Sequence, residues 1–240
     1  MLVAEKPRLE ASVTFDIAGA IAGFRQSIAL LVAIFSSGAV FGIMARQVGM
    51  RLTESVLMSG FVFAGASQFA SLDLWITPLP LITIVLTTLA INLRYILMGA
   101  ALHPWFKELS KTQIYGSLFF MGDESWALAM REFSSGGRNA SLMIGSGISQ
   151  SIVWVSSTAV GYIVSTSIKN PAKWGIDFVF TAAFVAILSS MWKKKLDLVP
   201  WAVSAAVALI ISFLVPGKWY ILAGGIAGSI VGYLRSNHES

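Results

Sequence analysis

Charged residues divide the chain into apolar stretches of about the length of a membrane helix. A hydrocarbon core about 30 Å thick needs about 20 consecutive apolar residues in a helix. The stretches that meet or approach this length are 26–45, 55–72, 74–93, 114–130, 139–168, 178–192, 198–214 and 219–234. The pattern predicts an all-α, polytopic membrane bundle of seven or eight transmembrane segments, seven if the 55–72 stretch is broken or re-entrant and does not cross.

Helix-breaking residues refine the limits of these segments. Pro78 and Pro80 place the start of the next helix at residue 79 or 80, because proline is tolerated only in the first turn. We expect this helix to continue past Arg94 and to stop before His103 and Pro104. A glycine pair beginning at Gly136 predicts the loop that precedes the 139–168 stretch.

Three regions follow from this division of the chain. Residues 1–24 form a cytoplasmic or interfacial lead-in, residues 25–235 the transmembrane domain, and residues 236–240 a short tail. Basic residues in the lead-in and at 193–195 favour a cytoplasmic side for both termini, since positive flanks stay inside.

Composition supports the membrane interpretation and excludes several functions. The chain has 240 residues, of which 56% are hydrophobic and 12% are charged, whereas soluble domains carry about 25% charged residues. The net charge of +5 comes from basic residues scattered at the ends of apolar runs. A nucleic-acid-binding surface needs a contiguous basic stripe, so nucleic acid is not expected as a partner. With no cysteine and two histidines, neither a disulfide nor a zinc site is expected, and no cofactor is predicted.

The 55–72 stretch carries polar residues within a segment that is otherwise apolar enough to lie in lipid. Gly65 is followed closely by Ser67 and Gln68. One interpretation is a close contact between helices, in which Ser67 and Gln68 bond to a neighbour. The other is an interrupted helix, because freed backbone groups at membrane depth are tolerated where they are buried or line a cavity, as in transporter substrate sites.

Two further groups of polar residues lie at membrane depth. Arg94, close to Asn92, either reaches an interface or pairs with an acid or a carboxylate ligand, since an intramembrane charge needs a partner. Asp123 and Glu124 are adjacent and point about 100° apart on a helix. One of them can therefore pair with Arg94 while the other faces a cavity and couples to protons. Alternatively, the acids mark the positive end of a helix that starts there.

These stretches together resemble the AzlC family, the large subunit of bacterial branched-chain amino-acid exporters of the LIV-E type. The segments "FVFAGASQFASL", "INLRYILMGAAL" and "MGDESWAL" are similar to three family motifs and occur in the same order. The resemblance begins near a Gly-Phe-Arg sequence at residue 23 and ends near residue 130. One departure is Tyr95, where many members carry histidine, so this position lacks a titratable imidazole here.

The resemblance implies a multi-pass protein of the bacterial or archaeal plasma membrane and a proton-motive-force-driven secondary transporter. Its cargo would be leucine, isoleucine and valine, with methionine as a further candidate, and its partner a small membrane subunit of the AzlD type. By motif position, the resemblance also implies a polar core. This core comprises Ser67, Gln68, Asn92, Arg94, Asp123 and Glu124. Gly65 is a further candidate, because backbone N–H groups near it could bind a carboxylate.

Two other function classes fit parts of the sequence less well. A membrane channel would show conductance without saturable exchange of amino acids. An intramembrane serine protease would use Ser67 as nucleophile and His103 as base, but His103 is expected near an interface and no oxyanion hole is evident. The chain is therefore predicted not to be an enzyme.

Overall fold

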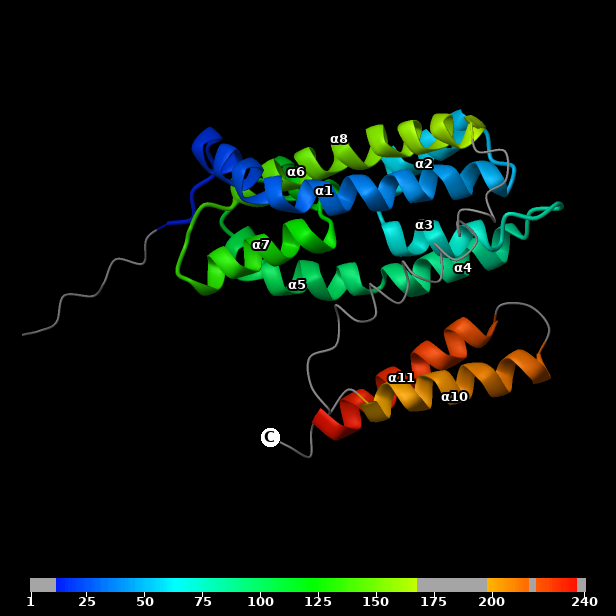
Figure 1. The fold of residues 1–240 in the computed structure, drawn as a ribbon. Coiled ribbons are helices and arrows are strands. Elements are labelled where there is room, and N and C mark those ends of the chain that lie inside the picture. Colours follow the sequence, from blue (N-terminus) through cyan, green and yellow to red (C-terminus); the bar gives the residue numbers. More distant parts are fainter. Residues whose placement is uncertain (1–11, 168–197, 216–218, 237–240) are drawn as a thin grey trace, which may run out of the picture. The chain divides into compact units, whose positions relative to one another are not determined.

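The computed structural model describes residues 12–167, 198–215 and 219–236, and its regular elements there are helices. This confirms the all-α prediction, while the predicted 178–192 segment lies outside the described residues. The chain divides into two compact units, one of Met1–Gly65 with Leu93–Ser167 and one of Ala66–Asn92 with Ile168–Ser240. Each unit is described by itself below, and Figure 1 gives the order of the elements.

Helices α1 (Ile17–Gln47) and α8 (Ser141–Val164) run side by side in the same direction through the first unit. Their backbones come so close that a methyl group at Gly23 would collide with the carbonyl of Leu142. Deeper in the contact, the hydroxyls of Ser27 and Ser149 lie 2.8 Å apart. Small residues and interhelical hydrogen bonds of this kind drive helix association in lipid. A single-turn 3₁₀ helix, η1 (Ser165–Ser167), extends the end of α8.

The start of α1 lies within the expected lead-in and is fixed to the start of α8. The carboxylate of Asp16 accepts the Gly19 N–H at 2.8 Å and the Asn139 side-chain N–H at 2.8 Å. Both bonds favour the charged form and lower the pKa of Asp16 below its ordinary value of 3.8. Thr14 adds a parallel β-bridge to Asn139.

The 55–72 stretch is an interrupted helix, as one of the two interpretations expected. It forms α2 (Leu52–Val62) and α3 (Gly65–Leu72), and Phe63 between them takes a left-handed backbone conformation with φ of 42°. α2 is bonded to α8 through the hydroxyls of Ser59 and Thr158, which lie 2.8 Å apart. Because α2 has only 11 residues, it ends beside the middle of α8.

The following span is divided into α4 (Leu81–Asn92) and α5 (Arg94–Phe106). The start at Leu81 agrees with the prolines, but the expected stop before His103 and Pro104 is wrong. The helix continues through Pro104 to Phe106, because Trp105 and Phe106 are buried in the core of the first unit. The Trp105 ring meets the edge of Phe133 at a centroid distance of 5.0 Å, and this packing outweighs the lost hydrogen bond.

The 114–130 stretch does not form one crossing helix. It is divided into α6 (Lys111–Phe119) and α7 (Asp123–Ser134), with Gly122 as the residue that precedes α7. α6 runs along α8 and ends at Phe119, and the turn that follows brings Gly122 near Gln150. α7 then turns back, since Ala129 shares a buried cluster with Ala140, just before the start of α8. The two half-helices therefore form a re-entrant hairpin (Figure 1).

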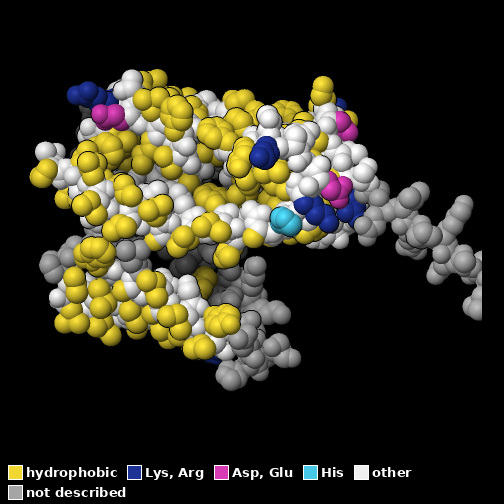
Figure 2. Space-filling model, turned by 180° about the vertical axis from the view of Figure 1, so that it is seen from behind, with side chains coloured by type: hydrophobic (Ala, Val, Ile, Leu, Met, Phe, Trp, Pro, Cys, Tyr) yellow, Lys and Arg dark blue, Asp and Glu magenta, His cyan; other side chains and the backbone are white. Residues whose placement is uncertain are grey.

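The second unit contains α3 beyond Gly65, α4, and the pair α10 (Leu198–Leu214) and α11 (Trp219–Ser236). The last two match the predicted segments and pack through small residues, with a methyl group at Gly228 falling 2.9 Å from the Ser204 side chain. Among the described residues, Ile17–Gln47, Leu81–Phe106 and Ser141–Ser167 are long and apolar enough to cross a membrane. Figure 2 shows hydrophobic side chains over most of one face, with charged ones in a few groups.

Candidate functional site

The candidate site lies where the interrupted helices of the first unit come to an end. α2 ends before Phe63, α5 begins at Arg94, and α7 begins at Asp123. Gln150 of α8 marks the depth of this region, because it lies about 14 Å along a helix about 36 Å long. Since a hydrocarbon core is about 30 Å thick, the helix ends meet near the middle of the membrane.

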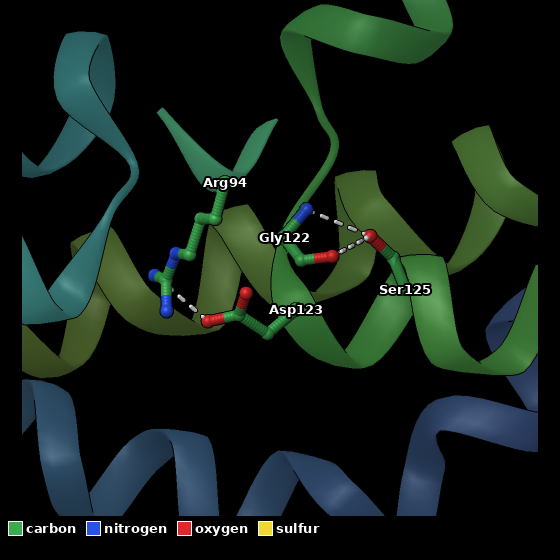
Figure 3. A network of polar contacts seen from close by, with 4 residues as sticks. All are labelled: Arg94, Gly122, Asp123 and Ser125. Atoms are coloured by element: carbon green, nitrogen blue, oxygen red, sulfur yellow. Dashed lines mark hydrogen bonds and ion pairs between the residues drawn. The ribbon is translucent and has the colours of Figure 1, made fainter. Parts of the chain in front are cut away.

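An ion pair joins two of these helix ends. Nη2 of Arg94 lies 2.9 Å from Oδ2 of Asp123, and the two side chains are 30% and 48% exposed (Figure 3). The structure therefore contains the pairing that the sequence allowed for. Asp123 also opens α7, where an acid is favourable at the positive helix end. The ion pair and the helix start at Asp123 are therefore both present, while proton coupling by either acid stays a prediction. Glu124 follows as an exposed neighbour.

Several contacts hold this ion pair in place. Ser125 Oγ accepts the Gly122 N–H at 2.8 Å, which fixes the turn before Asp123 (Figure 3). One turn further on, the Trp126 indole N–H donates to the Met98 carbonyl at 3.0 Å and ties α7 to α5. The two charges are thus carried on helices that are joined to each other, which gives them a fixed separation.

A cavity of about 320 Å³ opens beside the ion pair. Its lining is formed by Val62, Phe63, Tyr95, Ile96, Leu118, Phe119 and Met121. The walls are apolar except for the phenol of Tyr95, whose ring lies 5.2 Å from the Arg94 guanidinium carbon. Ligand pockets range from about 300 to 1,000 Å³, so this one suits a small molecule with an apolar part.

The structure brings together some of the sequence-predicted residues and not others. Arg94, Asp123 and Glu124 share one region of the first unit. Gly65 belongs to the same unit and lies close to the side chain of Trp154. A methyl group at Gly65 would stand 3.1 Å from the Trp154 ring, so the absence of a side chain allows this approach. The other three belong to the second unit, where Ser67 and Gln68 are buried on α3 and Asn92 ends α4.

Four residues of the site region were not singled out as site residues in the sequence. Phe63 and Tyr95 line the cavity, Gly122 sets the turn before Asp123, and Gln150 lies buried beside that turn. Within the described part of the chain, neither amide atom of Gln150 has a hydrogen-bond partner. For Gln150, the available signal in the sequence was an amide side chain in the middle of the uncharged 139–168 stretch.

The described residues contain no group of three or more His, Cys, Asp or Glu side chains that could hold a metal ion. The chemistry within reach of the site is therefore that of a cation, a carboxylate, a phenol and an apolar wall. Such a set can bind a small molecule that carries opposite charges and a hydrophobic side chain.

Comparison with known proteins places this arrangement in context. A family model described as "AzlC protein" matches residues 29–168. The inner membrane protein YgaZ of Escherichia coli K12 is 28% identical over 89% of both chains. The branched-chain amino acid transport protein AzlC of Bacillus subtilis 168 is 25% identical over 72% of this chain and 70% of its own. No solved structure matches the chain.

Proposed function

The chain belongs to the AzlC family of membrane transport proteins, and we propose that it is the large subunit of a branched-chain amino-acid exporter. In this proposal the proton motive force drives leucine, isoleucine and valine, with methionine as a further candidate, out of the cell. The printed name of the Bacillus subtilis relative supports the class of cargo. The observation that carries the proposal is the Arg94–Asp123 pair beside an apolar cavity.

The ion pair suits a zwitterionic cargo. In the structure Arg94 and Asp123 neutralise each other across 2.9 Å. An amino acid can enter between them without changing the net charge, with its carboxylate on Arg94 and its ammonium on Asp123. The charged hydrogen bonds that form with the cargo then replace the ion pair that breaks. The branched side chain enters the cavity, whose apolar lining favours burial of aliphatic surface.

Proton coupling follows from the same pair. A proton on Asp123 removes its negative charge, so the carboxyl releases both the ammonium of the cargo and Arg94. Glu124 is the second proton-coupling candidate, because it is exposed beside Asp123. Ser67, Gln68, Asn92 and the backbone at Gly65 stay predictions from the sequence as substrate-binding residues.

The proposal includes a small membrane subunit of the AzlD type as partner. Its support is the family membership together with the large apolar side chains exposed along the helices, such as Leu97, Ile152 and Phe213, which are 74%, 63% and 86% exposed. Lipid covers part of this surface in a membrane, and a second hydrophobic subunit is proposed to cover another part.

Transport in proteoliposomes tests the proposed function. The chain is reconstituted with and without a small AzlD-type subunit, and radiolabelled leucine or valine is followed under an imposed pH gradient. We expect saturable transport that depends on the gradient and stops when a protonophore dissipates it. Absence of gradient-driven transport for every branched-chain amino acid contradicts the proposal. Conductance without saturation points to a channel instead.

A further inference from the structure

We propose that Gln150 is a substrate-binding residue, whose amide hydrogen-bonds the charged end groups of the transported amino acid. The inference rests on the proposed function and adds a contact that neither the family motifs nor the ion pair supplies. It begins from a side chain whose burial and surroundings have no explanation in the packing of the helices.

Gln150 is a buried amide without a partner. The residue is 1% exposed, and neither Nε2 nor Oε1 has a hydrogen-bond partner in the described part of the chain. A buried polar group left in this state is costly, because it loses its bonds to water and gains none. Such a group in a transporter is explained by a ligand that supplies the missing bonds.

The neighbouring polar residues of α8 show that this helix normally satisfies its hydroxyls. Ser149 bonds Ser27 across the contact with α1, and Thr158 bonds Ser59 of α2, both at 2.8 Å. Ser146 donates to the Leu142 carbonyl at 3.0 Å. Gln150 differs from these residues because its amide has no such partner among the described residues and lies near the turn before α7.

The direction of the Gln150 amide places it at the candidate site. A methyl group at Gly122 would lie 3.8 Å from Oε1 of Gln150 and 3.5 Å from the ring of Phe63. The amide and the ring therefore converge on the turn that precedes Asp123. Phe63 is also part of the cavity lining, so the turn near the amide also adjoins a residue that lines the cavity.

The conformation of Phe63 is consistent with a functional position. Its φ of 42° is left-handed, which is unfavourable for a bulky residue and is found preferentially at ligand clamps and switches. The chemistry of Gln150 matches the proposed cargo, because its NH₂ group donates to a carboxylate and its carbonyl accepts from an ammonium. A single neutral side chain can thus contact either end of a zwitterion without disturbing the charge balance of Arg94 and Asp123.

Transport kinetics of Gln150→Leu test the inference against a purely structural role. We expect the KM for leucine to rise about tenfold, which corresponds to about 1.4 kcal/mol, with the melting temperature of the empty protein unchanged or higher. Leucine should also lose its stabilising effect on thermal unfolding at concentrations that stabilise the wild type. If Gln150→Leu does not fold, Gln150→Met provides the same test, because methionine is nearly as long and more flexible.

Ser149→Ala is the matched control on the adjacent residue. It removes a structural hydrogen bond, so we expect a lower melting temperature and an unchanged KM. A KM within twofold of wild type in the Gln150 variants overturns the inference and leaves the amide to bound water. If the wild type itself shows no saturable leucine transport, the proposed function fails first and the inference falls with it.

Discussion

Neutralising one or both members of the Arg94–Asp123 pair separates its structural role from its transport role. The variants are Arg94→Gln, Asp123→Asn and the double substitution. Each single variant leaves one charge at membrane depth without its partner, whereas the double variant leaves none. We therefore expect the double variant to be no less stable than either single variant, although all three lose leucine transport.

The size of the effect follows from the separation and exposure of the two groups. Unit charges 2.9 Å apart attract by about 6 kcal/mol at an effective dielectric constant of about 20. Desolvation offsets much of this, and the side chains are 30% and 48% exposed. Exposed pairs contribute about 0.2–1 kcal/mol, and deleting one partner of a buried pair costs about 3–5 kcal/mol. We expect an intermediate loss of about 2 kcal/mol for each single variant.

Thermal unfolding in detergent measures these losses, and the four proteins form a double-mutant cycle. A loss of about 2 kcal/mol corresponds to a fall of about 4–8 °C in melting temperature for a chain of this size. Arg131→Gln, an exposed residue in the last turn of α7, serves as control and should change stability by less than about 0.5 kcal/mol. A double variant whose loss equals the sum of the single losses refutes the coupling.

Three further substitutions test the packing, the cavity and the start of α1. Gly23→Ala places a methyl group against the backbone of α8 and should lower the melting temperature. Gly225→Ala in α11 is the control, because its methyl group meets no atom within 4 Å. Equal melting temperatures for the two variants contradict the close approach of α1 and α8. Ile96→Trp fills the cavity from an exposed position and should raise the KM for leucine. Leu97→Trp is the control, because Leu97 is also exposed but lies outside the lining. Equal KM values for the two variants argue against the cavity as the cargo site. The lowered pKa of Asp16 means that its contribution to stability is complete above its ordinary value of 3.8 and is lost as the pH falls through the lower folded value. Melting temperatures measured from pH 5 downward should therefore fall more steeply for wild type than for Asp16→Asn, and parallel curves contradict this assignment.

The sequence predicted the helices whose ends are marked by strong local signals. Proline placed the start of α4, and apolar length placed α10 within its observed bounds, Leu198–Leu214. It failed where tertiary contacts decide the outcome. Pro104 does not end α5, because burial of Trp105 and Phe106 favours one more turn. The sequence allowed for a helix that starts at Asp123, but it did not predict that α6 and α7 form a hairpin, because apolar content does not show whether the chain crosses or turns back.

The charged residues of the candidate site could be predicted from the sequence. Arg94 and Asp123 needed partners at membrane depth, and the structure pairs them. Gln150 could not be found in this way, because a lack of hydrogen-bond partners depends on which helix ends lie opposite it. Phe63 gave no signal either, since sequence preference assigns left-handed backbone to glycine or asparagine rather than to a bulky aromatic residue.

Competition by leucine analogues that lack one charged group tests most directly whether the site binds both ends of an amino acid. Transport of labelled leucine by the wild-type protein with the proposed small subunit is measured against isoamylamine, which lacks the carboxylate, and 4-methylpentanoate, which lacks the ammonium. Each lost charged hydrogen bond is worth about 1.5–3 kcal/mol, so both analogues should compete at least about tenfold more weakly than unlabelled leucine. Competition by either analogue as strong as that of leucine contradicts the account, because the site would then not bind the end that the analogue lacks.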